Sequence, residues 1–111
     1  MEQLQTLFGS RSMASSLLFI EAYGSGYASE IASTFDVPLN AVQRQLIKLE
    51  TNGILVSRTI GRTRVFEFNP RGRMVRDLRE FLTAQIESMP KDVYQQYFCQ
   101  RRRPRRTGKK L

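Results

Sequence analysis

The chain has 111 residues, of which 18 are Lys or Arg and 10 are Asp or Glu, so its formal net charge is +8. It contains no His, no Trp and a single Cys, which excludes an imidazole general base, an internal disulfide and a Cys-rich metal cage. The strongest apolar run, Leu17-Leu18-Phe19-Ile20, is far shorter than the roughly 20 residues of a membrane span, and the N-terminus lacks the basic region of a signal peptide. We therefore expect a small cytoplasmic domain that binds a partner.

Three helices are expected in the first half of the chain. The first begins at Ser10, a typical N-cap, and runs to about residue 23. The second covers 28–35 and the third covers about 39–52, with Gly53 following its end. Apolar residues recur in them at helical spacing: Met13, Leu17, Ile20, Ile31, Ala32, Phe35, Val42, Leu46 and Leu49. Two helices joined by a short turn are typical of a helix-turn-helix.

After Gly53 the period changes from helical to extended. Residues 54–60 and 63–68 are rich in β-branched and aromatic side chains, which favours two strands. Gly61-Arg62 joins them, and glycine at the first position of a two-residue turn predicts a type II′ hairpin.

A further helix is expected after the hairpin, with Asn69 as its cap and Pro70 as its first residue, running to about residue 89. Its apolar stripe is Met74, Leu78, Phe81, Leu82, Ile86 and Met89. Such a stripe is usually core, but this domain has few other elements to cover six large side chains. A last short helix over 91–98 would hold Val93, Tyr94, Tyr97 and Phe98.

The positive charge is concentrated in two parts of the chain. Residues 40–79 hold nine cations and three acids, whereas 99–111 hold seven cations and no acid. The segments 1–39 and 80–98 are net acidic, so the body is polarised around a basic middle. A basic surface of this kind attracts phosphate groups.

We expect a domain at 1–90, a short helix at 91–98 and a disordered basic tail at 99–111, because the tail has almost nothing apolar to bury. The tail either only aids solubility or acts as an arm, from Arg101 to Lys110, that contacts a nucleic-acid backbone. Cys99 is either an incidental thiol or a redox switch beside basic residues.

Three helices followed by a hairpin predict a winged helix-turn-helix, a mainly α fold with a small β-hairpin (α+β). Its helix fits the major groove of B-DNA, while the hairpin, or wing, reaches the flanking backbone or minor groove. The expected DNA contacts are Pro38, Leu39, Asn40, Gln43, Arg44, Lys48, Arg58, Arg62, Thr63 and Arg64. Asn40 and Gln43 suit base edges, Arg44 suits guanine, and a charged but merely solvated helix face is the alternative. Lys48 suits phosphate.

Several short motifs accompany this pattern: Glu30-Ile31-Ala32, Val37 in the turn, the inward Val42, Leu46 and Leu49, and Gly53-Ile54-Leu55. With them, the segment from Tyr27 to Val56 resembles the helix-turn-helix of ArsR-type winged-helix regulators, and MarR-type regulators share much of the pattern. The leading Leu7-Phe8-Gly9-Ser10 and the exit Phe68-Asn69-Pro70-Arg71 are also similar, so the resemblance covers roughly residues 4–89. It implies a dimeric bacterial or archaeal transcription factor, usually a repressor, associated with the nucleoid.

The first and last helices form the dimer interface in the resembling family. The expected interface residues are therefore Leu4, Leu7, Phe8, Met74, Leu78, Phe81, Leu82, Ile86 and Met89. A symmetric dimer would place two recognition helices roughly 34 Å apart on a pseudo-palindromic operator. Tyr27, Ala28 and Ser29 stand where metal sensors of the family carry cysteines, and His is absent, so no metal or other cofactor is expected.

The main hypothesis is a homodimeric, sequence-specific DNA-binding transcriptional regulator. The alternative is an RNA- or ribosome-associated, or protein-docking, winged-helix module, for which the Arg-rich tail would also be suitable. An enzyme is not expected, because no paired carboxylates, nucleophile with a base or Gly-rich phosphate loop occurs in the sequence.

Overall fold

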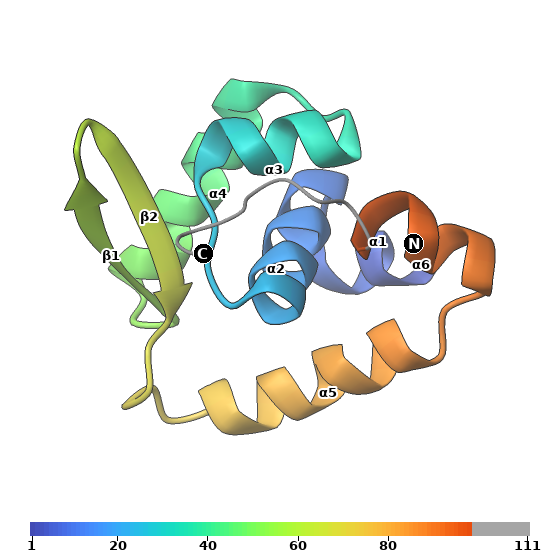
Figure 1. Cartoon of the computed structure of the whole chain (residues 1–111). Helices are drawn as coiled ribbons and strands as arrows, with labels where there is room; N and C mark the ends of the chain where they lie inside the picture. The colour runs from blue at the N-terminus through green and yellow to red at the C-terminus, as the bar shows by residue number, and fades with distance from the viewer. Residues whose placement is uncertain (99–111) are drawn as a thin grey trace, which may run out of the picture.

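The computed structural model describes residues 1–98 (Figure 1). In this range the elements are α1 (Glu2–Phe8), α2 (Arg11–Tyr23), α3 (Ala28–Phe35), α4 (Leu39–Thr51), β1 (Leu55–Ile60), β2 (Thr63–Phe68), α5 (Val75–Glu87) and α6 (Lys91–Phe98). This is a mainly helical α+β architecture with a two-stranded antiparallel sheet, consistent with a winged helix-turn-helix. The predictions for the tail and Cys99 fall outside the described residues. None of the helices in 1–98 is both long enough and apolar enough to span a bilayer.

α2 lies at the centre of the molecule, where it contacts each of the other helices (Figure 1). Every side chain from Ala14 to Ile20 is buried, because this stretch is apolar or small on all sides rather than along one stripe. The helix begins at Ser10 as predicted, since the Ser10 Oγ accepts a hydrogen bond from the Met13 N–H at 3.1 Å. The preceding helix, α1, was not predicted as an element from the sequence.

α3 and α4 form the helix-turn-helix. Val42, Leu46 and Leu49 of α4 are buried, which confirms them as its inward residues. The chain turns between the helices at Asp36, which has a left-handed backbone with φ of 55°. α4 thus rests on α2 and α3 along one side and presents its opposite side to solvent.

The hairpin follows directly from the end of α4 at Gly53, whose φ of 80° favours glycine. Its strands pair from Leu55 with Phe68 outward to a two-residue turn of Gly61 and Arg62. Gly61 has φ of 63° and Arg62 has no positive φ, which confirms the predicted type II′ turn.

Gly26, just before α3, ties the hairpin to the helical body. Its N–H donates to the Phe66 carbonyl at 3.0 Å, and the Phe66 N–H donates back to the Gly26 carbonyl at 2.8 Å. A Cβ at this position would lie 2.8 Å from Cδ1 of Phe19, so only glycine allows this approach. The inner end of the wing is therefore fixed against α2.

The predicted start of the helix after the hairpin, at Asn69-Pro70, is wrong, because α5 begins at Val75. The Asn69 Oδ1 instead accepts a hydrogen bond from the Arg71 N–H at 3.0 Å, and its Nδ2 donates to the Gly53 carbonyl at 2.9 Å. Asn followed by Pro favours a tight turn as well as a helix cap, since the same side-chain oxygen serves both. This turn carries the chain past the end of α4 before α5 begins.

α6 is the short helix expected near the C-terminal end of the body. Phe98 is buried, and the Tyr97 ring stacks on Phe35 of α3 with 4.6 Å between ring centroids. The Tyr23 hydroxyl donates to the Tyr97 carbonyl at 2.8 Å. α6 therefore packs into the same core as the helix-turn-helix.

Candidate nucleic-acid interface

The solvent side of α4 carries two parallel rows of side chains, because residues four positions apart lie on the same side of a helix. We call the row beside the hairpin the inner row: Leu39, Gln43 and Ile47. The adjacent outer row is Asn40, Arg44 and Lys48. All six side chains are exposed. Within residues 1–98 the polar side chains of both rows have no hydrogen bond or ion pair, so their donors and acceptors are available to a partner.

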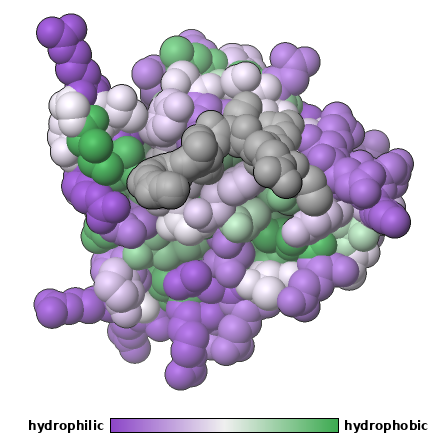
Figure 2. Space-filling view, viewed as in Figure 1, coloured by the Kyte–Doolittle hydropathy of each residue, from purple (hydrophilic) through white to green (hydrophobic). Residues whose placement is uncertain are grey.

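The wing adds cations next to these rows. Arg62 and Thr63 are exposed at its turn, and Figure 2 shows hydrophilic side chains projecting at this end of the molecule. Arg58 is also exposed, but its Nη1 lies 2.9 Å from Oε2 of Glu67 on the other strand. An exposed pair of this kind is held by less than about 1 kcal/mol, so Arg58 can exchange Glu67 for a phosphate.

Arg64, also a predicted DNA contact, has partners within the chain. Its Nη2 donates to Oε1 of Glu50 in the last turn of α4, and its Nε donates to the Ser57 hydroxyl at 3.1 Å. The Ser57 hydroxyl donates in turn to Oε2 of Glu50 at 2.6 Å, and the guanidinium lies 5.2 Å from the ring centroid of Phe66. Arg64 thus links both strands of the wing to the last turn of α4.

A groove of about 440 Å³ runs between α4 and the wing. The inner row forms one wall, and Arg62, Thr63 and Arg64 form the other. Ile47 and Tyr27, which also line it, were not among the predicted contacts. One sequence feature could have identified Ile47: it is the one large aliphatic residue of 40–51 that does not belong to the buried side of the helix, Val42, Leu46 and Leu49.

Two further exposed cations near this surface were not predicted as contacts. Arg71 and Arg73 lie in the turn after the hairpin, which is hydrogen-bonded to Gly53 at the end of α4. Both belong to the basic segment 40–79, whose charge was the signal for them. They extend the positive surface from the wing toward the C-terminal end of α4.

The residues predicted for a dimer interface separate into three groups. Leu4, Leu82 and Ile86 are buried within a single chain, so they are not available to a second copy. Leu7, Met74 and Phe81 are exposed, and Leu7 and Phe81 line a groove of about 620 Å³ between α1 and α5. The others, Phe8, Leu78 and Met89, are partly buried against the core.

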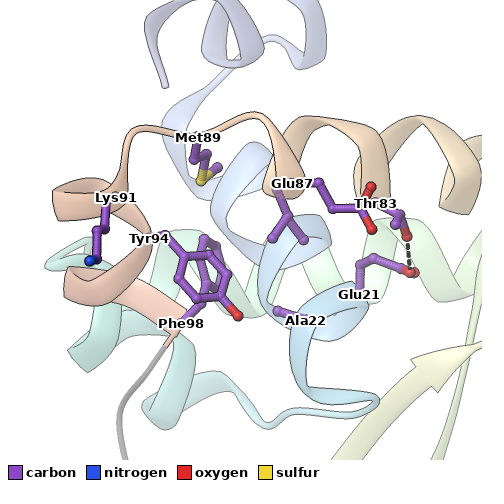
Figure 3. A pocket seen from close by; sticks show the side chains of 9 residues that line it. Glu21, Ala22, Thr83, Glu87, Met89, Lys91, Tyr94 and Phe98 are labelled. Atoms are coloured by element: carbon purple, nitrogen blue, oxygen red, sulfur yellow. Dashed lines mark hydrogen bonds between the residues drawn. The ribbon is translucent and has the colours of Figure 1, made fainter.

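A separate cleft of about 590 Å³ lies between α2, α5 and α6 (Figure 3). Glu21, with its side chain 11% exposed, accepts hydrogen bonds there from Nε of Arg79 at 2.8 Å and from the Thr83 hydroxyl at 2.6 Å. Arg79 also lies over the Phe68 ring, 5.4 Å from its centroid. Glu21 therefore ties α5 to α2 through Arg79 and Thr83, and Arg79 also contacts β2. In residues 1–98 no three His, Cys, Asp or Glu side chains lie close enough together to hold a metal ion.

No protein-family model and no curated protein matches the sequence. Among solved structures, the fold is similar to the X-ray crystal structure of the YusO protein from Bacillus subtilis, with a TM-score of 0.53. The two sequences are 18% identical, and the match covers 85% of this chain and 73% of that chain. At this identity the similarity concerns the fold: helices arranged around α2, with the helix-turn-helix and the hairpin on one side.

Proposed function

We propose that this protein is a transcriptional regulator that binds double-stranded DNA, with α4 in the major groove and the wing beside it. The observation that carries the proposal is the exposed, unpartnered set of Asn40, Gln43 and Arg44 on the second helix of the helix-turn-helix. Side chains must have free donors and acceptors to read base edges, and their neighbours must neutralise phosphate. Both conditions are met on this side of the molecule.

Each exposed polar residue has a role that follows from its chemistry. Asn40 and Gln43 present amides, which pair with the N6 and N7 atoms of adenine, whereas Arg44 bonds guanine through two parallel hydrogen bonds. Lys48 and Arg62 neutralise backbone phosphates on either side of the DNA major groove. Pro38, Leu39 and Thr63 complete the contact surface, and Arg64 contributes by holding the wing in place.

The proposal extends to a homodimeric repressor of the ArsR/MarR-like type. The resemblance of Tyr27–Val56 supports that class, and the exposed apolar residues Leu7, Met74 and Phe81 support association of two copies through α1 and α5. A two-fold axis between them would direct two α4 helices to half-sites roughly 34 Å apart. Such a regulator needs no metal and has no catalytic activity, and it would work at the nucleoid.

The decisive test is selection of duplexes from a random DNA pool with the purified full-length chain, followed by affinity measurements at a stated salt concentration. We expect one enriched, pseudo-palindromic sequence that is bound about a thousandfold or more tightly than random DNA. Transfer RNA should compete no better than random DNA does. Tighter binding to transfer RNA than to any selected duplex would favour the RNA-binding alternative.

A further inference from the structure

The inner row of α4 contains two large aliphatic side chains that the fold leaves in water. Leu39 is 45% exposed and Ile47 is 49% exposed. Neither belongs to the buried core or to the partly buried apolar residues that pack against it. A single exposed aliphatic residue is common on a protein surface. Here two of them lie in one row, with Gln43 between them, on the wall of one groove.

The surroundings of this row restrict what could cover it. The opposite wall of the groove carries Arg62 and Arg64, and the neighbouring outer row carries Arg44 and Lys48. A second copy of the same surface would bring these cations against one another. The partner that fits is therefore an anionic surface with a groove that admits a helix and exposes apolar groups at its floor. The major groove of DNA meets this description, because the thymine 5-methyl group is its apolar feature.

We propose that the inner row reads A·T base pairs, with Leu39 and Ile47 each covering a thymine methyl and Gln43 bonding an adenine between them. The inference rests on the proposed function and adds the base composition that α4 prefers. Leu39 and Ile47 lie about 12 Å apart along the helix axis. Their two thymines therefore lie no more than about four base pairs apart. The outer row, through Arg44, then adds a guanine beside this A·T segment.

The test uses the duplex that the full-length chain itself selects from a random pool. Each thymine of that duplex is replaced in turn by deoxyuridine, which removes the methyl group and leaves base pairing unchanged. We expect the affinity to fall about fourfold at each of two positions in a half-site, because each loses one buried methyl contact. The remaining thymines should tolerate the replacement within about twofold.

Variants then assign each methyl to a side chain. Leu39→Ala should abolish the effect of deoxyuridine at one position, and Ile47→Ala should abolish it at the other. Both residues are nearly half exposed, so the variants should fold, and circular dichroism checks this. Lys48→Ala is the matched control, since loss of a phosphate contact lowers the affinity equally for the thymine and deoxyuridine duplexes.

Three results would overturn the inference. An enriched sequence whose deoxyuridine forms all bind as well as the thymine form would refute methyl recognition and leave DNA binding intact. If both alanine variants kept the full deoxyuridine effect at both positions, other residues would contact the methyl groups, and the assignment to Leu39 and Ile47 would be refuted. Failure of the pool to yield any enriched sequence would refute the proposed function itself.

Discussion

At the scale of single residues, Arg44 gives the sharpest prediction. Its guanidinium is exposed in the middle of the outer row and has no partner in residues 1–98. Arg44→Ala should weaken binding to the selected duplex by about 1–3 kcal/mol and weaken binding to random DNA much less, because it removes hydrogen bonds to a base. Fluorescence anisotropy titrations with both duplexes measure the difference.

Lys91→Ala is the control for this substitution, because it removes one positive charge from α6, away from the wing (Figure 1). It should change both affinities slightly and equally. If Arg44→Ala weakens selected and random duplexes by the same factor, Arg44 contacts phosphate only.

Arg44 and Arg64 show how far the sequence alone predicts whether an arginine side chain is free to contact DNA. Both lie in the basic middle of the chain, and both are predicted to contact DNA. The partner of Arg64 is Glu50, 14 positions earlier and on another element, so no local pattern identifies it. Exposure of Arg44 followed from the helical period alone, since Val42, Leu46 and Leu49 define the opposite side.

At the scale of elements, a stability experiment can separate the buried face of α5 from the exposed surface of the adjacent α1. Leu82 is fully buried on α2, whereas Leu7 of the adjacent α1 is 63% exposed. Leu82→Ala should lower the free energy of unfolding by about 2–5 kcal/mol, because it leaves a cavity. Leu7→Ala makes the same chemical change in solvent and should cost less than about 0.5 kcal/mol.

Urea denaturation followed by circular dichroism measures both values. Urea titrations at two protein concentrations separate the stability of the single chain from the stability that association adds, because only the latter depends on protein concentration. Equal losses for the two variants would contradict the assignment of Leu82 to the core and Leu7 to the surface.

Local sequence patterns predicted the elements with strong periodicity. α4 and the hairpin follow from spacing and from Gly53 and Gly61, whose positive φ values few other residues would tolerate. The start of α5 did not follow, because the Asn69 side chain donates a hydrogen bond to the carbonyl of Gly53, a distant residue in the chain. The apolar stripe of α5 likewise did not distinguish core from surface, since that division depends on where α1 and α2 lie.

At the scale of the whole molecule, the exposed apolar residues of α1 and α5 predict association. We expect analytical ultracentrifugation at micromolar concentration to show a dimer, and Phe81→Glu to shift it to monomer by placing a charge at the contact. Phe81 is 37% exposed and meets Phe8 edge to face, with ring centroids 6.3 Å apart. The substitution removes this ring contact but places its charge on a partly exposed position, so circular dichroism should still show a folded chain.

Tyr94→Glu is the matched control, because Tyr94 is an aromatic residue of α6 with 38% exposure outside this surface. It should remain dimeric. A monomeric parent protein, or equal dissociation of both variants, would exclude a dimer through α1 and α5.

The two backbone hydrogen bonds between Gly26 and Phe66 have a consequence for the motion of the wing. A lone two-stranded hairpin is marginally stable in water, but here its inner end is anchored by these bonds and by the buried Leu55 and Phe68. We expect the amide hydrogens of Gly26 and Phe66 to exchange with deuterium only when the body opens, and those around Gly61 to exchange within the fluctuations of the native state. Rapid exchange at Phe66 would show that the anchor opens independently. Slow exchange at Phe66 would instead mean that the proposed regulator meets DNA with a wing whose base is rigid and whose tip adapts to the backbone it touches.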